Sequence, residues 1–71
     1  MREIKLREGE AYIKLGQTLK KAGISPSGVD AKFEILDGLV KVNGEVETRR
    51  GRKLVAGDVF SCESEEYRII E

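Results

Sequence analysis

The chain has 71 residues, and its 13 Lys and Arg are balanced by 13 Asp and Glu. It is long enough for one domain with a small core, and it has no apolar run near the roughly 18 residues of a membrane span. Its charged N-terminus lacks a signal segment. We therefore expect a single cytoplasmic domain, residues 1–71, with no membrane partner. Cys62 is the one cysteine, so it can form no internal disulfide and is predicted to be a small buried residue.

The charges are unevenly distributed although their sum is zero. Residues 12–58 contain nine basic and six acidic residues, a surplus of three positive charges. Residues 59–71 contain one basic and four acidic residues, a surplus of three negative charges. Such asymmetry is more informative than the sum, and it indicates an anionic partner for the middle of the chain.

The N-terminal residues alternate between charged and apolar side chains and predict a short edge strand with Ile4 and Leu6 facing inward. The period then changes, because Leu15, Leu19 and Ala22 recur at helical spacing. They predict a helix that begins at residue 12 or 13 and ends at a glycine. Another face of this helix is polar, which suits either a solvated surface or an anion-binding one. Its members are Lys14, Gln17 and Lys21, flanked by Lys20.

A second helix is predicted next, and a glycine at position 38 ends it. Its cap is either Ser25 with Pro26 or Ser27 with Asp30. Its predicted buried stripe, with Phe33 in the core, consists of Val29, Phe33 and Leu36. The polar residues divide into an acidic side and a basic side, so a polyanion could approach only the latter. These residues are Asp30, Glu34 and Asp37 on one side, and Lys32, near Gly28, on the other.

A β-hairpin is predicted after the second helix. Val40, Val42 and Val46 alternate with charged residues, and Asn43-Gly44 between them is the strongest short-range hairpin signal. A turn at residues 57–58 and two further strands, about 59–62 and 67–70, complete a small sheet.

A cationic loop follows the hairpin. Four of five consecutive positions are basic: Arg49, Arg50, Arg52 and Lys53. These residues cannot be buried together, so they are expected to line a solvated rim. The planar guanidinium group suits bidentate phosphate contacts. Cations that merely protect a sheet edge would be expected among mixed signs, so the shared sign favours an anionic partner.

Catalysis is not expected. The chain has no His and a single Cys, so it lacks the usual general base and zinc ligands. No phosphate-binding glycine loop of the Walker or dinucleotide type is present. A cap, a helix end and a turn explain Asp30, Asp37 and Asp58. We therefore expect no enzyme, no metal, no cofactor and no small-molecule substrate.

These elements resemble, in order, the S-four RNA-binding domain, or alpha-L motif, named after ribosomal small-subunit protein four. The likeness covers about residues 14–60, and its most specific parts are the run from Gly38 to Gly44 and the turn at Gly57-Asp58. The longer run from Val42 to Arg50 resembles the short stand-alone bacterial members. In larger relatives that the resemblance brings in, the module is attached to enzymes, binds structured RNA and does no chemistry itself.

The resemblance implies an RNA-binding surface formed by both helices and the following β-loop. Carried over by position, its residues are Lys14, Gln17, Lys21, Ser27, Lys32, Lys41, Thr48, Arg49, Arg50, Arg52 and Lys53. One departure is at residues 27–28, where many members have Ser-Arg and this chain has Ser-Gly. The difference removes one expected phosphate contact, for which the arginines at 49 and 50 would compensate.

We thus predict an α+β domain with two short N-terminal helices packed on a small, mostly antiparallel sheet. Its predicted function is to bind structured RNA, ribosomal or tRNA-like, with the ribosomal subunit as a candidate partner. Contacts would go mainly to phosphates and riboses, because Tyr12 and Tyr67 are too few for a base-stacking platform. The alternative is a protein–protein adaptor of the translation or replication machinery, using the acidic C-terminal hairpin or an exposed sheet edge.

Overall fold

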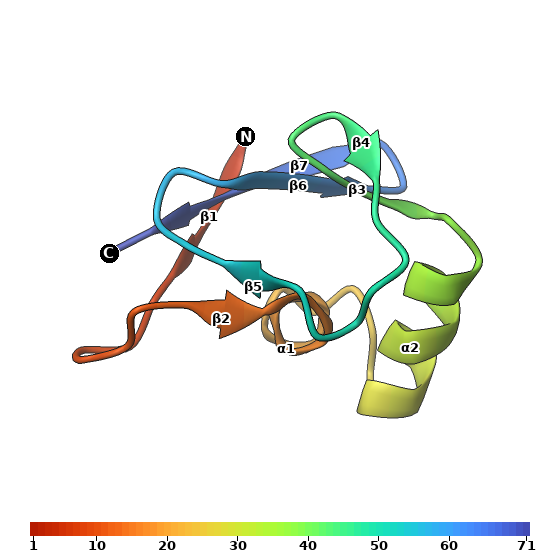
Figure 1. Ribbon diagram of the computed structural model, residues 1–71, viewed down its shortest axis with the longest axis horizontal. Helices are drawn as coiled ribbons and strands as arrows, with labels where there is room; N and C mark the ends of the chain where they lie inside the picture. The colour runs from red at the N-terminus through yellow and green to blue at the C-terminus, as the bar shows by residue number, and fades with distance from the viewer.

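The computed structural model describes all 71 residues and combines two short helices with a five-stranded sheet (Figure 1). The strand order is β1-β7-β6-β3-β4, and only the β1–β7 pair is parallel. The strands are β1 (Arg2–Lys5), β3 (Val40–Val42), β4 (Glu45–Val46), β6 (Val59–Cys62) and β7 (Glu65–Ile70). The predicted α+β class with a mostly antiparallel sheet is confirmed, and the N-terminal strand lies at an edge as expected.

A second, two-stranded sheet connects the first helix to the basic loop. It pairs β2 (Ile13–Lys14) with β5 (Lys53–Leu54), and helix α1 (Leu15–Lys21) follows β2 directly. The prediction that this helix begins at residue 12 or 13 is therefore wrong. The β-branched side chain of Ile13 is buried opposite Leu54 in the strand pair, an environment that suits it better than a helix does.

The core lies between the five-stranded sheet and the layer of α1, β2 and β5, which Figure 1 shows below the sheet. Leu15 and Leu19 of α1 are fully buried, and Ala22 packs against the same cluster, as the apolar spacing predicted. Phe60 and Tyr67 stand opposite each other on β6 and β7, with ring centroids 4.8 Å apart. Tyr67 is therefore a core residue and not available to stack on a base.

Helix α2 (Gly28–Leu36) packs against α1 at one end of the molecule (Figure 1). The second of the two predicted caps is observed, because the Ser27 hydroxyl accepts a hydrogen bond from the Asp30 amide at 3.3 Å. The buried face of α2 consists of Ala31 and Ile35, which are fully inaccessible. The small side chain of Ala31 fits a face packed closely against α1.

The predicted burial of the other apolar stripe of α2 is wrong. Val29, Phe33 and Leu36 are 62%, 58% and 54% exposed. At 100° per residue, Phe33 lies about 180° from the middle of the Ala31–Ile35 face. Helix α2 therefore has two apolar faces, and the smaller side chains are the ones that meet the core.

The turns of the sheet follow the sequence prediction. Asn43 and Gly44 join β3 to β4 with φ values of 51° and 87°, as the Asn-Gly signal requires. The Asn43 side chain also accepts a hydrogen bond from the Val59 amide at 3.0 Å and donates one to Asp58 at 3.2 Å. The hairpin turn is thus fixed to the turn that precedes β6.

The C-terminal hairpin, β6–β7, lies inside the sheet between β1 and β3, so the free edges are β1 and β4. Cys62 on β6 is buried, as predicted. Burial first, and then the carboxylates of Glu34 and Glu63, raise the pKa of its thiol to about 11. Neither helix has the length and apolar character needed to cross a membrane.

Candidate nucleic-acid interface

The start of α1 is joined to the basic loop by backbone hydrogen bonds. The amide of Leu15 donates to the carbonyl of Arg52 at 2.8 Å, and the amide of Gly16 donates to the carbonyl of Arg50 at 3.0 Å. The neighbouring β2–β5 pair places Lys14 directly opposite Lys53. Like charges opposite each other on two strands are destabilising, so this pair has no evident structural benefit and is suited to an anion.

Gly16 allows the loop to approach the helix closely. A β-carbon at this position would lie 2.6 Å from Cγ and 3.2 Å from Cδ of Arg50. The stem of Arg50 therefore crosses the helix where the missing side chain leaves room. This contact orients the Arg50 side chain in the free protein, without a ligand.

A shallow, open hollow follows from this arrangement, between α1, the tip of the basic loop and the start of α2. Three of the predicted binding residues lie together there, and no acidic residue lines the hollow. The lining residues are Lys14, Gly16, Gln17, Lys20, Gly28, Arg50 and Gly51. We call this set, with Lys53 beside Lys14, the basic hollow.

Lys20 belongs to the basic hollow although the family resemblance did not assign it to the site. The helical spacing contained the signal, because Lys20 follows Gln17 by three residues and so occupies the next turn of the same side of α1. Gly28 occupies the position at which the family resemblance would lead us to expect an arginine. It has no side chain, so it contributes only backbone to the wall of the hollow.

Glu47 organises the rest of the basic loop, a role that the sequence analysis did not predict. It is 6% exposed. One carboxylate oxygen accepts hydrogen bonds from Nη2 of Arg49 at 3.0 Å and from Nη1 of Arg52 at 2.9 Å. The other accepts from the amide and Nε of Arg49, both at 3.1 Å.

These contacts lower the pKa of Glu47 from its ordinary 4.5 to about 2. The hydrogen bonds from Arg49 and then Arg52 are the main causes, and they outweigh the opposing effect of burial. The loop cations line a solvated rim as expected, and only Arg52 is partly buried, with 31% of its side chain exposed. Arg49 and Arg52 have a buried counterion and hold the loop in shape, whereas Arg50 faces the basic hollow.

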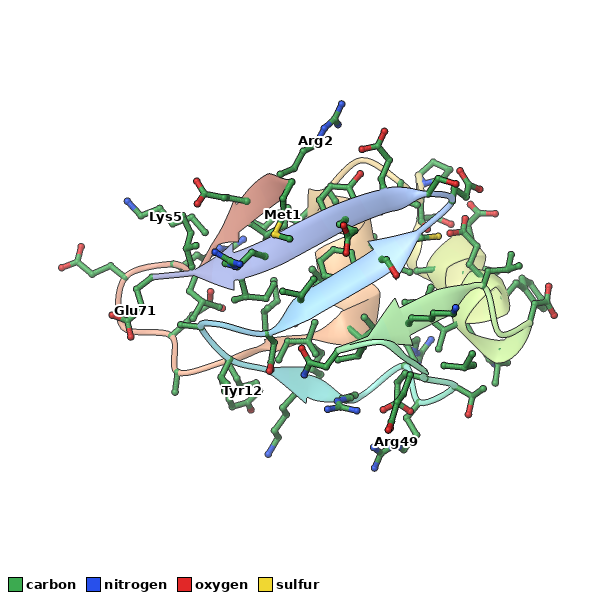
Figure 2. The ribbon with its side chains drawn as sticks, turned by 90° about the horizontal axis from the view of Figure 1, so that it is seen from above. Met1, Arg2, Lys5, Tyr12, Arg49 and Glu71 are labelled. Atoms are coloured by element: carbon green, nitrogen blue, oxygen red, sulfur yellow. The ribbon has the colours of Figure 1, made fainter.

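An aromatic residue borders the same surface. The ammonium of Lys53 lies 4.8 Å from the ring centroid of Tyr12, within the range of a cation–π contact. Figure 2 shows Tyr12 and Arg49 along one margin of the molecule, on either side of β5, while Arg2 lies across the sheet at the opposite margin. The contact holds the Lys53 side chain beside Tyr12, which precedes the strand β2 that contains Lys14.

Two further predicted residues have structural partners. The ammonium of Lys21 donates a hydrogen bond to the carbonyl of Lys5, which ties the end of α1 to β1. Lys21 also lines a second hollow beside the first, together with Arg7, Glu10, Ile13, Gln17 and Lys20. The hydroxyl of Ser27 caps α2 and donates to the carboxylate of Asp30 at 2.8 Å.

The remaining three predicted residues do not line the basic hollow. Lys32 is exposed on α2, one turn after Gly28, and so borders the hollow on that side. Thr48 is exposed between Glu47 and Arg49. Lys41 is exposed on β3 opposite Ser61, in a depression that also contains Glu63 and Glu66. The structure does not bring Lys41 together with the other cations.

The fold and the cationic surface define a class of small α+β domains, and the chain belongs to the S4 domain family, whose model matches residues 4–70. YbcJ of Escherichia coli is 41% identical over 59 residues, which cover 83% of this chain and 84% of YbcJ. Its solution structure, described as an alpha-L motif involved in RNA binding, matches all of this chain and 89% of that chain. The TM-score is 0.75 and the identity in that alignment is 37%.

A second relative comes from another bacterium. The Bacillus subtilis protein named "Probable ribosome maturation protein RlbA" is 49% identical over 51 residues, which cover 72% of each chain. The names of these relatives refer to RNA binding and ribosome maturation rather than to catalysis. The predicted family and the alpha-L fold are confirmed.

Proposed function

We propose that this chain binds structured RNA through the basic hollow, and that its target is ribosomal RNA in a maturing subunit. The observation that carries the proposal is the acid-free wall of Lys14, Lys20 and Arg50, with Lys53 held directly opposite Lys14. The name of the B. subtilis relative supports the ribosomal target. No group in the hollow needs to act as an acid, a base or a nucleophile for this role.

The contacts proposed are mainly with phosphates. Lys and Arg side chains neutralise phosphates without reading sequence, and the arrangement offers four of them with no carboxylate partner: Lys14, Lys20, Arg50 and Lys53. An open hollow of this kind suits the shape of a folded RNA backbone better than a single base.

The test is a titration of a folded ribosomal RNA fragment, followed by fluorescence anisotropy at several salt concentrations. Four phosphate contacts predict a slope of log affinity against log salt of roughly −3 to −4. The double variant Lys14→Gln, Lys53→Gln should bind more weakly at every salt concentration, with about half that slope. Its unfolding free energy should change by less than about 1 kcal/mol, because removal of the like-charge pair and loss of the Lys53–Tyr12 contact oppose each other.

Lys41→Gln is the matched control, since it removes one exposed lysine from the other face of the sheet. It should keep the affinity and the slope of the parent protein. Tight binding that ignores salt, or an equal loss in Lys41→Gln, would contradict the proposal. Association with ribosomal subunits that survives the double substitution would instead favour an adaptor role through protein contacts.

A further inference from the structure

The outer face of α2 is apolar and has no partner within the chain. Val29, Phe33 and Leu36 are each more than half exposed on this one face. Val46 extends the apolar surface beyond the end of the helix: it is 55% exposed, and its Cγ1 lies 3.7 Å from the position of a β-carbon at Gly38. Contiguous apolar surface of this kind, bordered by polar residues, marks interaction sites in soluble proteins. We call it the outer α2 face.

The charges around the outer α2 face are sorted. At 100° per residue, Asp30 and Asp37 border the apolar stripe on one side, and Lys32 borders it on the other. Asp37 is the C-cap of α2, and the last turn contains no basic residue. The helix end does not explain Asp37 as the sequence suggested, because a carboxylate at this end opposes the helix dipole. This placement is explained if the carboxylate serves a contact outside the chain.

We propose that the outer α2 face binds a protein segment that is helical, apolar on one side and basic along the flank that meets Asp30 and Asp37. The segment would lay its apolar residues against Phe33 and its neighbours, and its lysines or arginines beside the two carboxylates. Two amphipathic helices that pack through apolar stripes and pair opposite charges along their flanks follow this pattern. The site is separate from the basic hollow and does not depend on the proposed RNA binding.

Two other occupants are less compatible with these charges. RNA would bring its phosphates against Asp30 and Asp37, whereas the cations of α2 and α1 lie toward Gly28. A second copy of the chain, packed through antiparallel α2 helices about a two-fold axis, would place equivalent flanks together. Each Asp30 and Asp37 would then face the acidic flank of the other copy, and such like-charge contacts are unfavourable.

The experiment uses two synthetic helical peptides with identical leucine faces, one with lysine flanks and the other with glutamate flanks. Each is about 18 residues long, because shorter isolated helices are marginal in water. We expect the lysine peptide to shift the NMR resonances of Val29, Phe33 and Leu36, and to bind about tenfold more tightly than the glutamate peptide. Asp30→Asn with Asp37→Asn should remove most of that difference.

The variant Phe33→Ser with Leu36→Ser is the matched loss-of-site control. It should abolish peptide binding while the RNA affinity stays that of the parent, and Lys14→Gln with Lys53→Gln should show the reverse. Equal affinity for the two peptides, no binding of either, or shifts confined to the basic hollow would overturn the proposal. So would RNA-induced shifts on the outer α2 face, or self-association of the parent chain that Phe33→Ser with Leu36→Ser abolishes.

Discussion

Helices α1 and α2 have the same apolar spacing and opposite exposures. Leu15 and Leu19 of α1 and its C-cap Ala22 lie against the core, whereas Val29, Phe33 and Leu36 of α2, at the same i, i+4, i+7 positions, face outward. The difference arises because α1 lies beneath the sheet and α2 packs on α1 at the end of the molecule (Figure 1). Apolar spacing therefore predicts a helix reliably, but it does not say which side of that helix the core will cover.

The two helices also divide the charged surface. The polar side of α1 faces the basic hollow, where no carboxylate is present, while α2 adds Gly28 to its wall and turns Asp30 and Asp37 away from it. A chain with no net charge thus obtains one cationic face and one apolar, acidic face on neighbouring helices. The first is suited to a polyanion and the second to a basic protein segment.

The largest expected difference between the helices is in stability. Leu19→Ala should lower the free energy of unfolding by about 2–5 kcal/mol, because a fully buried side chain is lost and a cavity remains. Phe33→Ala should change it by less than about 0.5 kcal/mol, since its ring is mostly in solvent. Urea denaturation of both variants measures the difference. Similar losses in the two would mean that Phe33 is buried and that the comparison of the helices is mistaken.

Local signals in the sequence predicted the parts of the fold that depend on local conformation. Asn43, Gly44 and Gly57 have positive φ values in their turns. Asn and Gly are the residues that adopt such values most easily, so the turns could be predicted from the residue types. The short strands β2 and β5 were not predicted. Each has two residues, too few for a period of two to be recognised, and they form because residues 39 and 41 positions apart in the chain pair with each other.

Candidate-site residues were predicted unevenly for a related reason. Lys14, Gln17 and Arg50 lie together because backbone hydrogen bonds join α1 to the loop, which a family resemblance can indicate. The roles of Glu47 and Gly16 depend on distances between side chains. An acidic residue just before a run of cations and a glycine within a helix were visible, but the residue types alone do not show which side chains they contact.

The loop arginines differ in their partners, because Arg49 and Arg52 share the buried counterion Glu47 whereas Arg50 faces the basic hollow. The pKa of Glu47 is lowered in the folded state, so its carboxylate contributes stability above pH about 4.5, which is lost as the pH falls toward about 2. Glu47→Gln should therefore be less stable than the parent at neutral pH, and the two should converge in acid. Thermal unfolding between pH 7 and pH 2 measures this.

Glu45→Gln makes the same charge change at an exposed position of β4 and should show no such convergence. In the RNA titration, Glu47→Gln should make the salt slope steeper by up to about 1, since Arg49 and Arg52 lose an ionised partner, whereas Arg50→Gln should flatten it by about 1. An unchanged slope in Glu47→Gln would show that the Glu47 carboxylate does not limit the contribution of Arg49 and Arg52 to RNA binding.

The smallest expected effect on stability concerns Gly16, where α1 and the basic loop approach each other closely. In Gly16→Ala, the new methyl group would lie 2.6 Å from Cγ of Arg50, so the Arg50 side chain has to move away from the basic hollow. The higher helix propensity of Ala, about 1 kcal/mol, offsets the strain of this shift. We therefore expect little change in the unfolding free energy and a loss of RNA affinity about equal to that of Arg50→Gln.

Gly28→Ala is the matched control for that variant, because Gly28 lines the same hollow from α2 and a β-carbon there meets no atom within 4 Å. It adds the same methyl group to the wall without displacing Arg50. An equal loss of RNA affinity in Gly28→Ala would mean that the hollow is sensitive to its volume rather than to the direction of Arg50. A loss confined to Gly16→Ala would show that contact with α1 orients this guanidinium group for binding.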